Sequence, residues 1–255
     1  MYTIYLAFLL FVTTAQSQIK NNSTIIFPFE SYENVSFITD DKRIGNGYTI
    51  DIAYANFYIY VSCPHKSCGG TLVRRNKVIT AAHCVDSCNF RQFEFTVGLN
   101  SLSELSVAKK YKAKSIKIHP KYAGSRPYDI AVATLKQNVE LNYKVGTINY
   151  ANIIPPVGGW LCIYGYGLIN LNKERPNNLQ KGAANIIDVK GTLILTQAQF
   201  GSSALPGDSG GPALYNNQLV GVISGYTHCG NTPLTNCFVA VAHPEVMKFI
   251  RKYAP

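Results

Sequence analysis

Short apolar and β-branched runs recur along the chain from about residue 57 to residue 241, with turn residues between them. The runs have the length of strands rather than of long helices. Many short strands at such spacing are typical of an all-β barrel or sandwich. The predicted strands are Phe57–Val61, Gly70–Val73, Lys77–Thr80, Phe93–Val97, Ala113–Ile118, Ile130–Leu135, Trp160–Tyr164, Ala183–Val189, Pro212–Leu214, Gln218–Ser224 and Phe238–Val241.

Two further features divide the chain. The stretch 149–159 holds Pro155-Pro156 and Gly158-Gly159, and it is predicted to connect two halves. At the C-terminal end, the apolar residues recur at helical spacing and share one face. They are Val246, Phe249, Ile250 and Tyr253, which predict a helix over about 243–255.

The first residues form an apolar run followed by small and polar residues, as in a secretory signal peptide, over 1–17. The next stretch, 18–43, is predicted to be a propeptide, and it contains candidate glycosylation sites at Asn21, Asn22 and Asn34. No later run is apolar for long enough to cross a bilayer. The sequence therefore predicts a secreted, extracellular product without a membrane span, and a retained N-terminal anchor is the alternative.

The formal net charge of the chain is +10, and removing 1–43 takes away three basic and four acidic residues, which leaves +11. Such a field favours anionic partners. No nucleic-acid-binding motif is present, and a basic surface of solvated lysines, such as those of Lys109–Lys114, is the expected explanation. No nucleic-acid partner is predicted.

Three motifs carry candidate chemistry. Ser209 lies in Gly207-Asp208-Ser209-Gly210-Gly211-Pro212, where the glycines let backbone approach a reacting carbonyl. His83 lies in Thr80-Ala81-Ala82-His83-Cys84, and Asp129 lies in Tyr128-Asp129-Ile130-Ala131-Val132. A serine nucleophile requires a base, and the base requires an acid that orients it. Taken singly, each motif also fits a simpler structure: a Gly/Pro turn, a buried histidine or a turn at a strand edge.

In this order, from about Arg43 to the C-terminus, the motifs resemble the trypsin/chymotrypsin family of serine proteases. The resemblance implies an all-β fold: two Greek-key-like antiparallel β-barrels, about 44–150 and 151–242, and a C-terminal helix. The active site would lie in the cleft between the barrels.

The same resemblance implies roles for the motif residues. Ser209 would be the nucleophile, His83 the base and Asp129 its orienting acid, and the N–H groups of Gly207 and Ser209 would form the oxyanion hole. No cofactor is expected, and no Cys/His spacing offers four convergent metal ligands.

The junction Asp40-Asp41-Lys42-Arg43 before Ile44 matches an activation site. A trypsin-like protease would cleave after Arg43, and the family resemblance implies that the new α-amine of Ile44 then pairs with Asp208. An ordinary charged linker is the alternative at this position.

Seven cysteines leave at least one thiol without an intramolecular partner. Cys68 and Cys84 match a disulfide common in the family. The spacing suggests two further pairs, Cys63 with Cys88 and Cys229 with Cys237. Cys162 is the candidate free thiol, because the position of its usual partner is Tyr215.

The specificity pocket departs from the family pattern. Ser203 falls at its base, where relatives that cleave after Lys or Arg carry Asp, so a non-basic preference is expected. Ser224 matches the family, whereas Tyr226 puts a ring where glycine usually opens the entrance. Asn236 replaces a pocket-lining glycine.

Three functions remain open. The first is a secreted serine endopeptidase, made as a zymogen, with restricted specificity for protein or peptide substrates. The second is a weak or inactive homologue that binds host proteins such as serum defence components. This alternative follows from a similarity to the mite proteases, a group that includes scabies-mite relatives, allergenic enzymes and inactivated paralogues. The third is a secreted carrier or lectin-like β-protein. A monomer is expected in each case.

Overall fold

The computed structural model describes residue 44 and residues 47–170, 173–226, 229 and 235–255. They all belong to one compact unit, Asp40–Pro255. The predicted signal peptide, the predicted propeptide with its glycosylation sites, and Arg43 lie outside the described residues.

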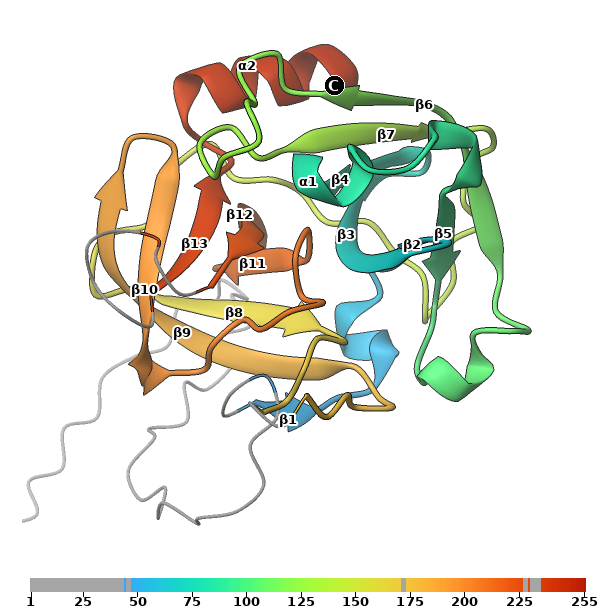
Figure 1. The fold of residues 1–255 in the computed structure, drawn as a ribbon, viewed down its shortest axis with the longest axis horizontal. Helices are drawn as coiled ribbons and strands as arrows, with labels where there is room; N and C mark the ends of the chain where they lie inside the picture. The colour runs from blue at the N-terminus through green and yellow to red at the C-terminus, as the bar shows by residue number, and fades with distance from the viewer. Residues whose placement is uncertain (1–43, 45–46, 171–172, 227–228, 230–234) are drawn as a thin grey trace, which may run out of the picture. The chain divides into compact units, whose positions relative to one another are not determined.

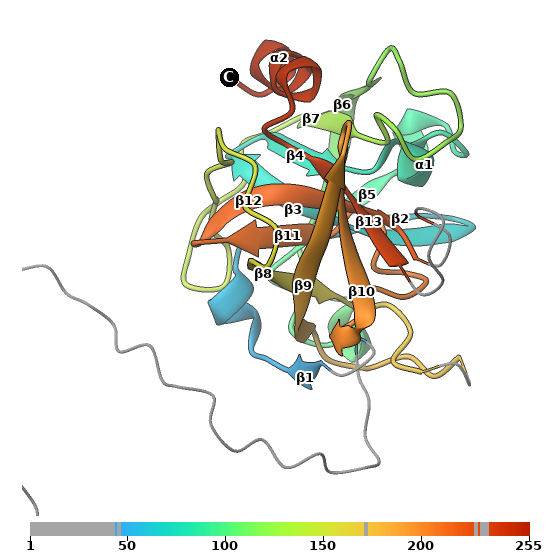
Figure 2. The ribbon, with the colours of Figure 1, turned by 90° about the vertical axis from the view of Figure 1, so that its left-hand side faces the viewer.

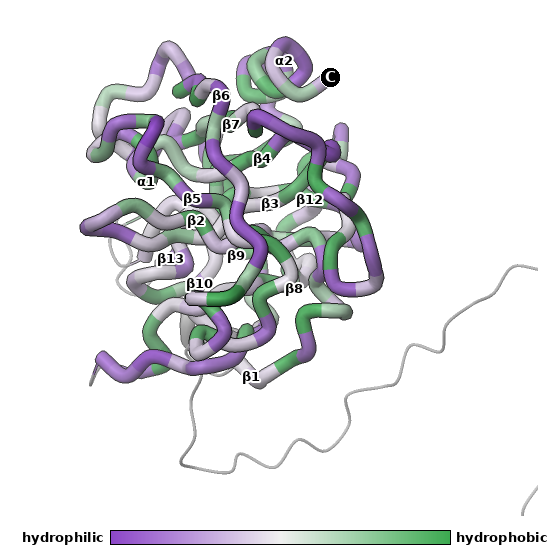
Figure 3. Tube along the Cα trace, turned by 90° about the vertical axis from the view of Figure 1, so that its right-hand side faces the viewer, coloured by the Kyte–Doolittle hydropathy of each residue, from purple (hydrophilic) through white to green (hydrophobic). Residues whose placement is uncertain are grey.

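The first half of the unit is a closed antiparallel barrel with the strand order β2-β3-β4-β7-β6-β5 (Figure 1). Its strands are β2 (Tyr58–Cys63), β3 (Lys66–Arg74), β4 (Lys77–Thr80), β5 (Glu94–Val97), β6 (Lys110–Ile118) and β7 (Ala131–Leu135). Polar and apolar residues alternate along β6, so that Tyr111 and Ala113 are buried while Lys110, Lys112 and Lys114 are exposed. This alternation is what a strand with one face on a core requires. Figure 3, coloured by hydropathy, shows hydrophilic and hydrophobic segments mixed along the chain.

The second half contains a seven-stranded antiparallel sheet with the order β1-β9-β10-β13-β12-β11-β8. Because β8 also pairs with β9, six of these strands close into a second barrel, and β1 pairs with the outer edge of β9. β9, β10 and β13 lie side by side in Figure 2. The strands are β1 (Tyr48–Thr49), β8 (Trp160–Gly165), β9 (Gln180–Lys190), β10 (Leu193–Gly201), β11 (Pro212–Tyr215), β12 (Gln218–Gly225) and β13 (Thr235–Ala240).

Two α-helices are described, α1 (Ala82–Val85) and α2 (Pro244–Tyr253), with short 3-10 helices at Ile52–Ala55, Phe90–Gln92 and Leu102–Glu104. None of the helices in the described part of the chain is long and apolar enough to cross a membrane. α2 lies over β7 in Figure 1, and its buried Val246, Phe249 and Ile250 join the core of the first barrel.

The two ends of the described chain are therefore exchanged between the barrels. α2 follows the second barrel in sequence but packs on the first. Conversely, β1 and the buried Ile44 belong to the second barrel by pairing and packing, although the range 44–150 assigned them to the first.

The architecture confirms the predicted fold class of two antiparallel barrels and a C-terminal helix. β10 has no counterpart among the predicted strands. This strand follows β9 after a tight turn at Gly191 and Thr192, where Gly191 has φ +56°. Gly-Thr is a weaker hairpin signal than Asn-Gly or Asp-Gly, so the sequence does not reveal the turn between β9 and β10.

Candidate active site

His83 and Asp129 are held together at the edge of the first barrel. The end of β4 runs directly into α1, which presents His83, and Asp129 lies just before β7. The His83 main-chain N–H donates to Asp129 Oδ1 at 2.9 Å, and His83 Nδ1 lies 2.6 Å from Asp129 Oδ2. One carboxylate thus fixes both the backbone and the ring of the histidine.

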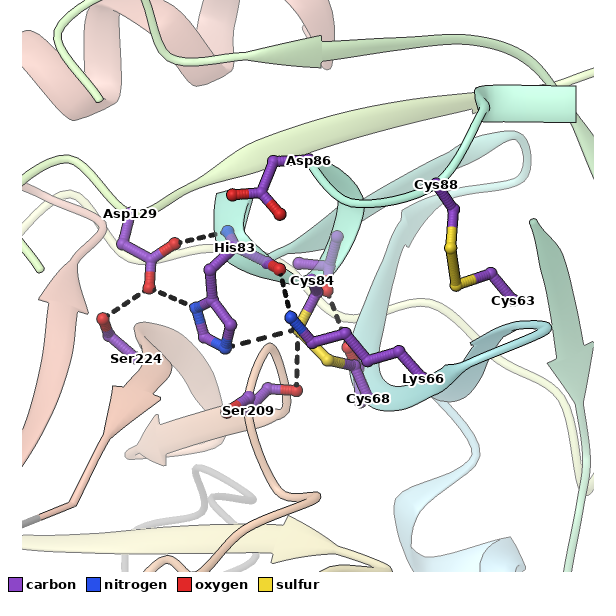
Figure 4. The surroundings of a disulfide bond; sticks show 12 residues. Cys63, Lys66, Cys68, His83, Cys84, Asp86, Cys88, Asp129, Ser209 and Ser224 are labelled. Atoms are coloured by element: carbon purple, nitrogen blue, oxygen red, sulfur yellow. Dashed lines mark hydrogen bonds and ion pairs between the residues drawn. A yellow bond between two sulfur atoms is a disulfide. The ribbon is translucent and has the colours of Figure 1, made fainter. Parts of the chain in front are cut away.

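The second barrel adds a third bond to this carboxylate. The Ser224 hydroxyl, near the end of β12, donates to Asp129 Oδ2 at 2.6 Å. Asp129 is 2% exposed, so these bonds replace the water that it would otherwise bind. With Nδ1–H directed at Asp129, Nε2 is the ring nitrogen that can accept a proton, and it lies 3.8 Å from the disulfide-bonded Cys84 Sγ. Figure 4 shows His83 between Asp129 and Ser209.

Ser209 lies in a turn that requires glycine on both sides. Gly207 and Gly210 have φ of +103° and +79°. A Cβ at position 210 would lie 2.2 Å from Thr80 Oγ1, so no larger residue fits without displacing β4. The Ser209 carbonyl accepts a hydrogen bond from Gly69 N–H at 2.8 Å, which ties the turn to the first barrel.

The N–H groups of this turn fall into two sets. Those of Asp208, Gly210 and Gly211 donate to carbonyls of Leu205, Ile223 and Asp208. Within the described residues, the N–H groups of Gly207 and Ser209 donate to no protein acceptor. Both residues line the main cleft.

The cleft itself has a volume of about 1080 Å³ and is lined by residues of both barrels, including His83, Asp129, Ser209 and Ser224. In the part of the chain that the structure describes, no hydrogen bond joins the Ser209 hydroxyl to His83. Bonds of this kind are often long in ligand-free enzymes and shorten when substrate binds.

Asp208 lies beneath the turn and is fully buried. Its carboxylate accepts hydrogen bonds from Gly167 N–H at 2.7 Å and Leu205 N–H at 2.9 Å. Burial raises the pKa of Asp208 to about 7, and these two hydrogen bonds oppose the shift. Ile44 is also fully buried, in the core of the second barrel.

The four residues expected in the specificity pocket separate into two pairs. Ser224 and Tyr226 line the cleft. Ser203 and Asn236 do not: the Ser203 hydroxyl donates to Asn236 Oδ1 at 3.0 Å, and Asn236 is fully buried. The base of the expected pocket is thus occupied by a neutral side-chain pair.

The cleft also contains several polar residues that the sequence motifs did not predict. Arg126, Arg175, Lys66 and Tyr122 all line it. Lys66 Nζ donates to the His83 carbonyl at 2.5 Å. Burial, with the negative charges of Asp129 and Asp86, raises the pKa of Tyr122 to about 12. The only sequence signal for Arg126 is its position three residues before Asp129.

The structure joins Cys63 to Cys88, Cys68 to Cys84, and Cys229 to Cys237, and Cys162 is the free cysteine among the described residues. Cys63 and Cys68 of the first two disulfides line the cleft, and Figure 4 shows both disulfides with His83 and Ser209. The Cys68 and Cys84 sulfurs also lie near His83, but as a disulfide they offer no thiolate to a metal ion.

Comparisons with known proteins agree with this geometry. The family model described as Trypsin matches residues 44–250. A chymase of Papio hamadryas is 32% identical over 184 residues, which cover 63% of this chain and 70% of the chymase. A trypsin of Sarcophaga bullata is 28% identical over 233 residues, or 84% of this chain and 90% of the trypsin.

Two solved structures share the fold. One is mouse neuropsin, a serine protease, with a TM-score of 0.71, 23% identity, and coverage of 81% of this chain and 97% of neuropsin. The other is a scabies mite inactivated protease paralogue, with a TM-score of 0.72, 20% identity, and coverage of 81% and 96%. Since the family model covers most of the sequence, this chain belongs to the trypsin/chymotrypsin family of serine proteases.

Proposed function

We propose that this protein is a secreted serine endopeptidase, made as a zymogen, with a restricted and non-basic specificity. The observation that carries the proposal is the content of one cleft. It holds His83 bonded to Asp129, together with Ser209 and the two unbonded N–H groups of Gly207 and Ser209. Nucleophile, base, orienting acid and oxyanion donors are the complete set for acyl transfer.

The proposed reaction has two halves. Ser209 Oγ attacks the substrate carbonyl carbon while His83 Nε2 takes the hydroxyl proton. The Gly207 and Ser209 N–H groups bind the resulting oxyanion, and Asp129 stabilises the imidazolium. The C–N bond then breaks as His83 returns the proton to the leaving amine. Water, deprotonated by His83, attacks the acyl-enzyme, and the proton returns to Ser209 as the acid leaves.

Activation is proposed to occur by cleavage after Arg43. The support is the state of Asp208, a buried carboxyl whose pKa is raised to about 7 by desolvation. The new ammonium of Ile44 would compensate the charge of this carboxylate. Asp208 adjoins Ser209, so an ion pair there would hold the catalytic turn in place.

The non-basic preference is supported by the base of the pocket. Ser203 and Asn236 bond to each other and carry no charge, so nothing there would pair with a substrate Lys or Arg. Tyr226 lines the cleft and would restrict the size of the side chain admitted.

A second candidate function rests on the Ser203–Asn236 pair and on the Tyr226 ring in the cleft. A narrowed pocket also suits a weak or inactive homologue that binds proteins, including host serum proteins, through its surface. Retained binding and biological effect in a Ser209→Ala variant would favour this alternative.

Covalent labelling tests the main proposal. The zymogen is cleaved with trypsin, the Ile44 N-terminus is confirmed, and a small organophosphorus reagent is added, because such a reagent requires little of the specificity pocket. We expect one equivalent of label on Ser209, and none before cleavage or in His83→Ala. Ser115→Ala, a serine on β6 away from the cleft, is the matched control and should label normally. Absence of label despite a free Ile44 would contradict the proposal.

A further inference from the structure

The guanidinium of Arg126 lies on the backbone of Gly225 within the cleft. Its two Nη atoms donate to the Ser224 carbonyl at 3.5 Å and to the Tyr226 carbonyl at 3.4 Å. A Cβ at position 225 would lie only 1.5 Å from Arg126 Nη1. Glycine at 225 therefore leaves the space that the guanidinium occupies.

The backbone under Arg126 is a free strand edge beside Ser209. β12 pairs with β11 through Pro212–Tyr215, and its last bonds on that side join Ile223 to Gly210 and Gly211. Beyond Ile223, no described strand pairs with the segment Ser224–Tyr226 on this side. The carbonyls of alternate residues in an extended strand point the same way, so an added peptide strand would find its acceptors there.

Arg126 occupies those acceptors, but it is held weakly. Both of its hydrogen bonds are at the long limit for N–H···O contacts. It is half-buried, and among the described residues neither Arg126 nor Arg175, the other arginine of the cleft, forms an ion pair with a carboxylate. The charge of Arg175 acts on the buried Asp208 carboxylate, so Arg126 is the guanidinium of the cleft that has no carboxylate partner among the described residues.

We infer that Arg126 selects peptides with an acidic side chain on the N-terminal side of the bond that is cleaved. An extended peptide whose carbonyl reaches Ser209 must displace Arg126 to bond with Ser224 and Tyr226. A neutral peptide breaks the two arginine bonds without replacing them. A carboxylate side chain offers the displaced guanidinium a bidentate, charge-assisted partner, which is stronger than the bonds it leaves.

The inference rests on the proposed peptidase activity, and it deepens it by naming a substrate class. The charge of the cleft agrees with the formal charge of +11 that remains without 1–43, because Lys66, Arg126 and Arg175 all line the cleft. The group that Arg126 would recognise is the side-chain carboxylate of an Asp or Glu within the few residues that precede the cleaved bond.

Matched peptides test the inference. Peptides that are cleaved at one bond are made with Asp or Asn at each of the three positions before it, and kcat/KM is measured. At one of these positions we expect Asp to exceed Asn by about tenfold or more, the value of a hydrogen bond to a charged group. Arg126→Gln should bring this ratio to near one. Arg251→Gln, which removes the same charge from the exposed side of α2, should retain the ratio.

Binding measurements separate this inference from the proposed activity. Fluorescence anisotropy of the same peptides on Ser209→Ala requires no turnover, so the Asp/Asn ratio can be measured in an inert protein. No organophosphorus label together with an Arg126-dependent binding ratio would overturn the activity and support the role of Arg126. A ratio near one in the unmodified protein, or a ratio unchanged by Arg126→Gln, would overturn the inference.

Discussion

The buried carboxyl of Asp208 predicts that activation cleavage changes how stability depends on pH. In the uncleaved chain the folded-state pKa is about 7, against an ordinary value of 3.8. Between these values the folded protein keeps a proton that the unfolded chain has lost. The free energy of unfolding therefore falls as pH rises from about 4 to 7 and levels off above it.

The magnitude follows from the shift in pKa. About three pKa units correspond to about 4 kcal/mol, at about 1.4 kcal/mol for each unit. After cleavage, the ammonium of Ile44 favours the charged carboxylate and lowers its pKa, so this fall should be absent or reversed.

Urea unfolding from pH 4 to 9 measures this difference, with Ser209→Ala as the background to prevent self-digestion. Asp208→Asn should remove the fall from the uncleaved chain, although the amide is a poorer partner for the two N–H groups and lowers stability at every pH. Asp188→Asn, at a partly exposed carboxylate paired with Lys190, is the control and should leave the slope unchanged. Equal slopes before and after cleavage would refute the reasoning.

Three further outcomes are expected. Ser209→Ala or His83→Ala should lower kcat for peptide cleavage by about three or more orders of magnitude, with residual catalysis from the oxyanion donors; rates equal to the unmodified protein would show that the triad is misassigned. Tyr226→Gly should raise kcat/KM for peptides with a large apolar residue before the cleaved bond, and an unchanged substrate profile would clear this ring of blocking the pocket. Phe249→Ala should lower the free energy of unfolding by about 3–5 kcal/mol. Phe249 is 6% exposed, and the centroid of its ring lies 4.9 Å from that of the His119 ring. A change below about 1 kcal/mol in urea titrations would show that α2 is not part of the core.

The parts of the site with a local signature were predictable from sequence. Ser209 lies between glycines because the turn requires positive φ at Gly207 and Gly210. A local backbone requirement of this kind can be recognised from the neighbouring residues in the sequence. The barrel strands were predictable for a similar reason, because a strand with one face on the core alternates polar and apolar residues. The catalytic roles of these residues remain predictions that labelling will test.

The parts that depend on distant contacts were not predictable. Arg126 has no local pattern, because its position depends on the empty space above Gly225, far away in the sequence. The Ser203–Asn236 pair likewise joins a loop to β13. The pairing of β1 with β9 was missed because a two-residue strand carries almost no periodicity.

The exchanged chain ends have a consequence for the order in which the protein can be made. During synthesis the first barrel emerges early, yet the helix that completes its core, α2, is translated after the second barrel. β1 emerges before either barrel and must wait for β9, its partner in the second. Each half thus holds an end of the other, and a chain arrested before α2 would expose the apolar surface that this helix covers. We expect a ribosome-bound chain lacking 244–255 to remain sensitive to protease in the first barrel, and resistance there to appear only when α2 is released.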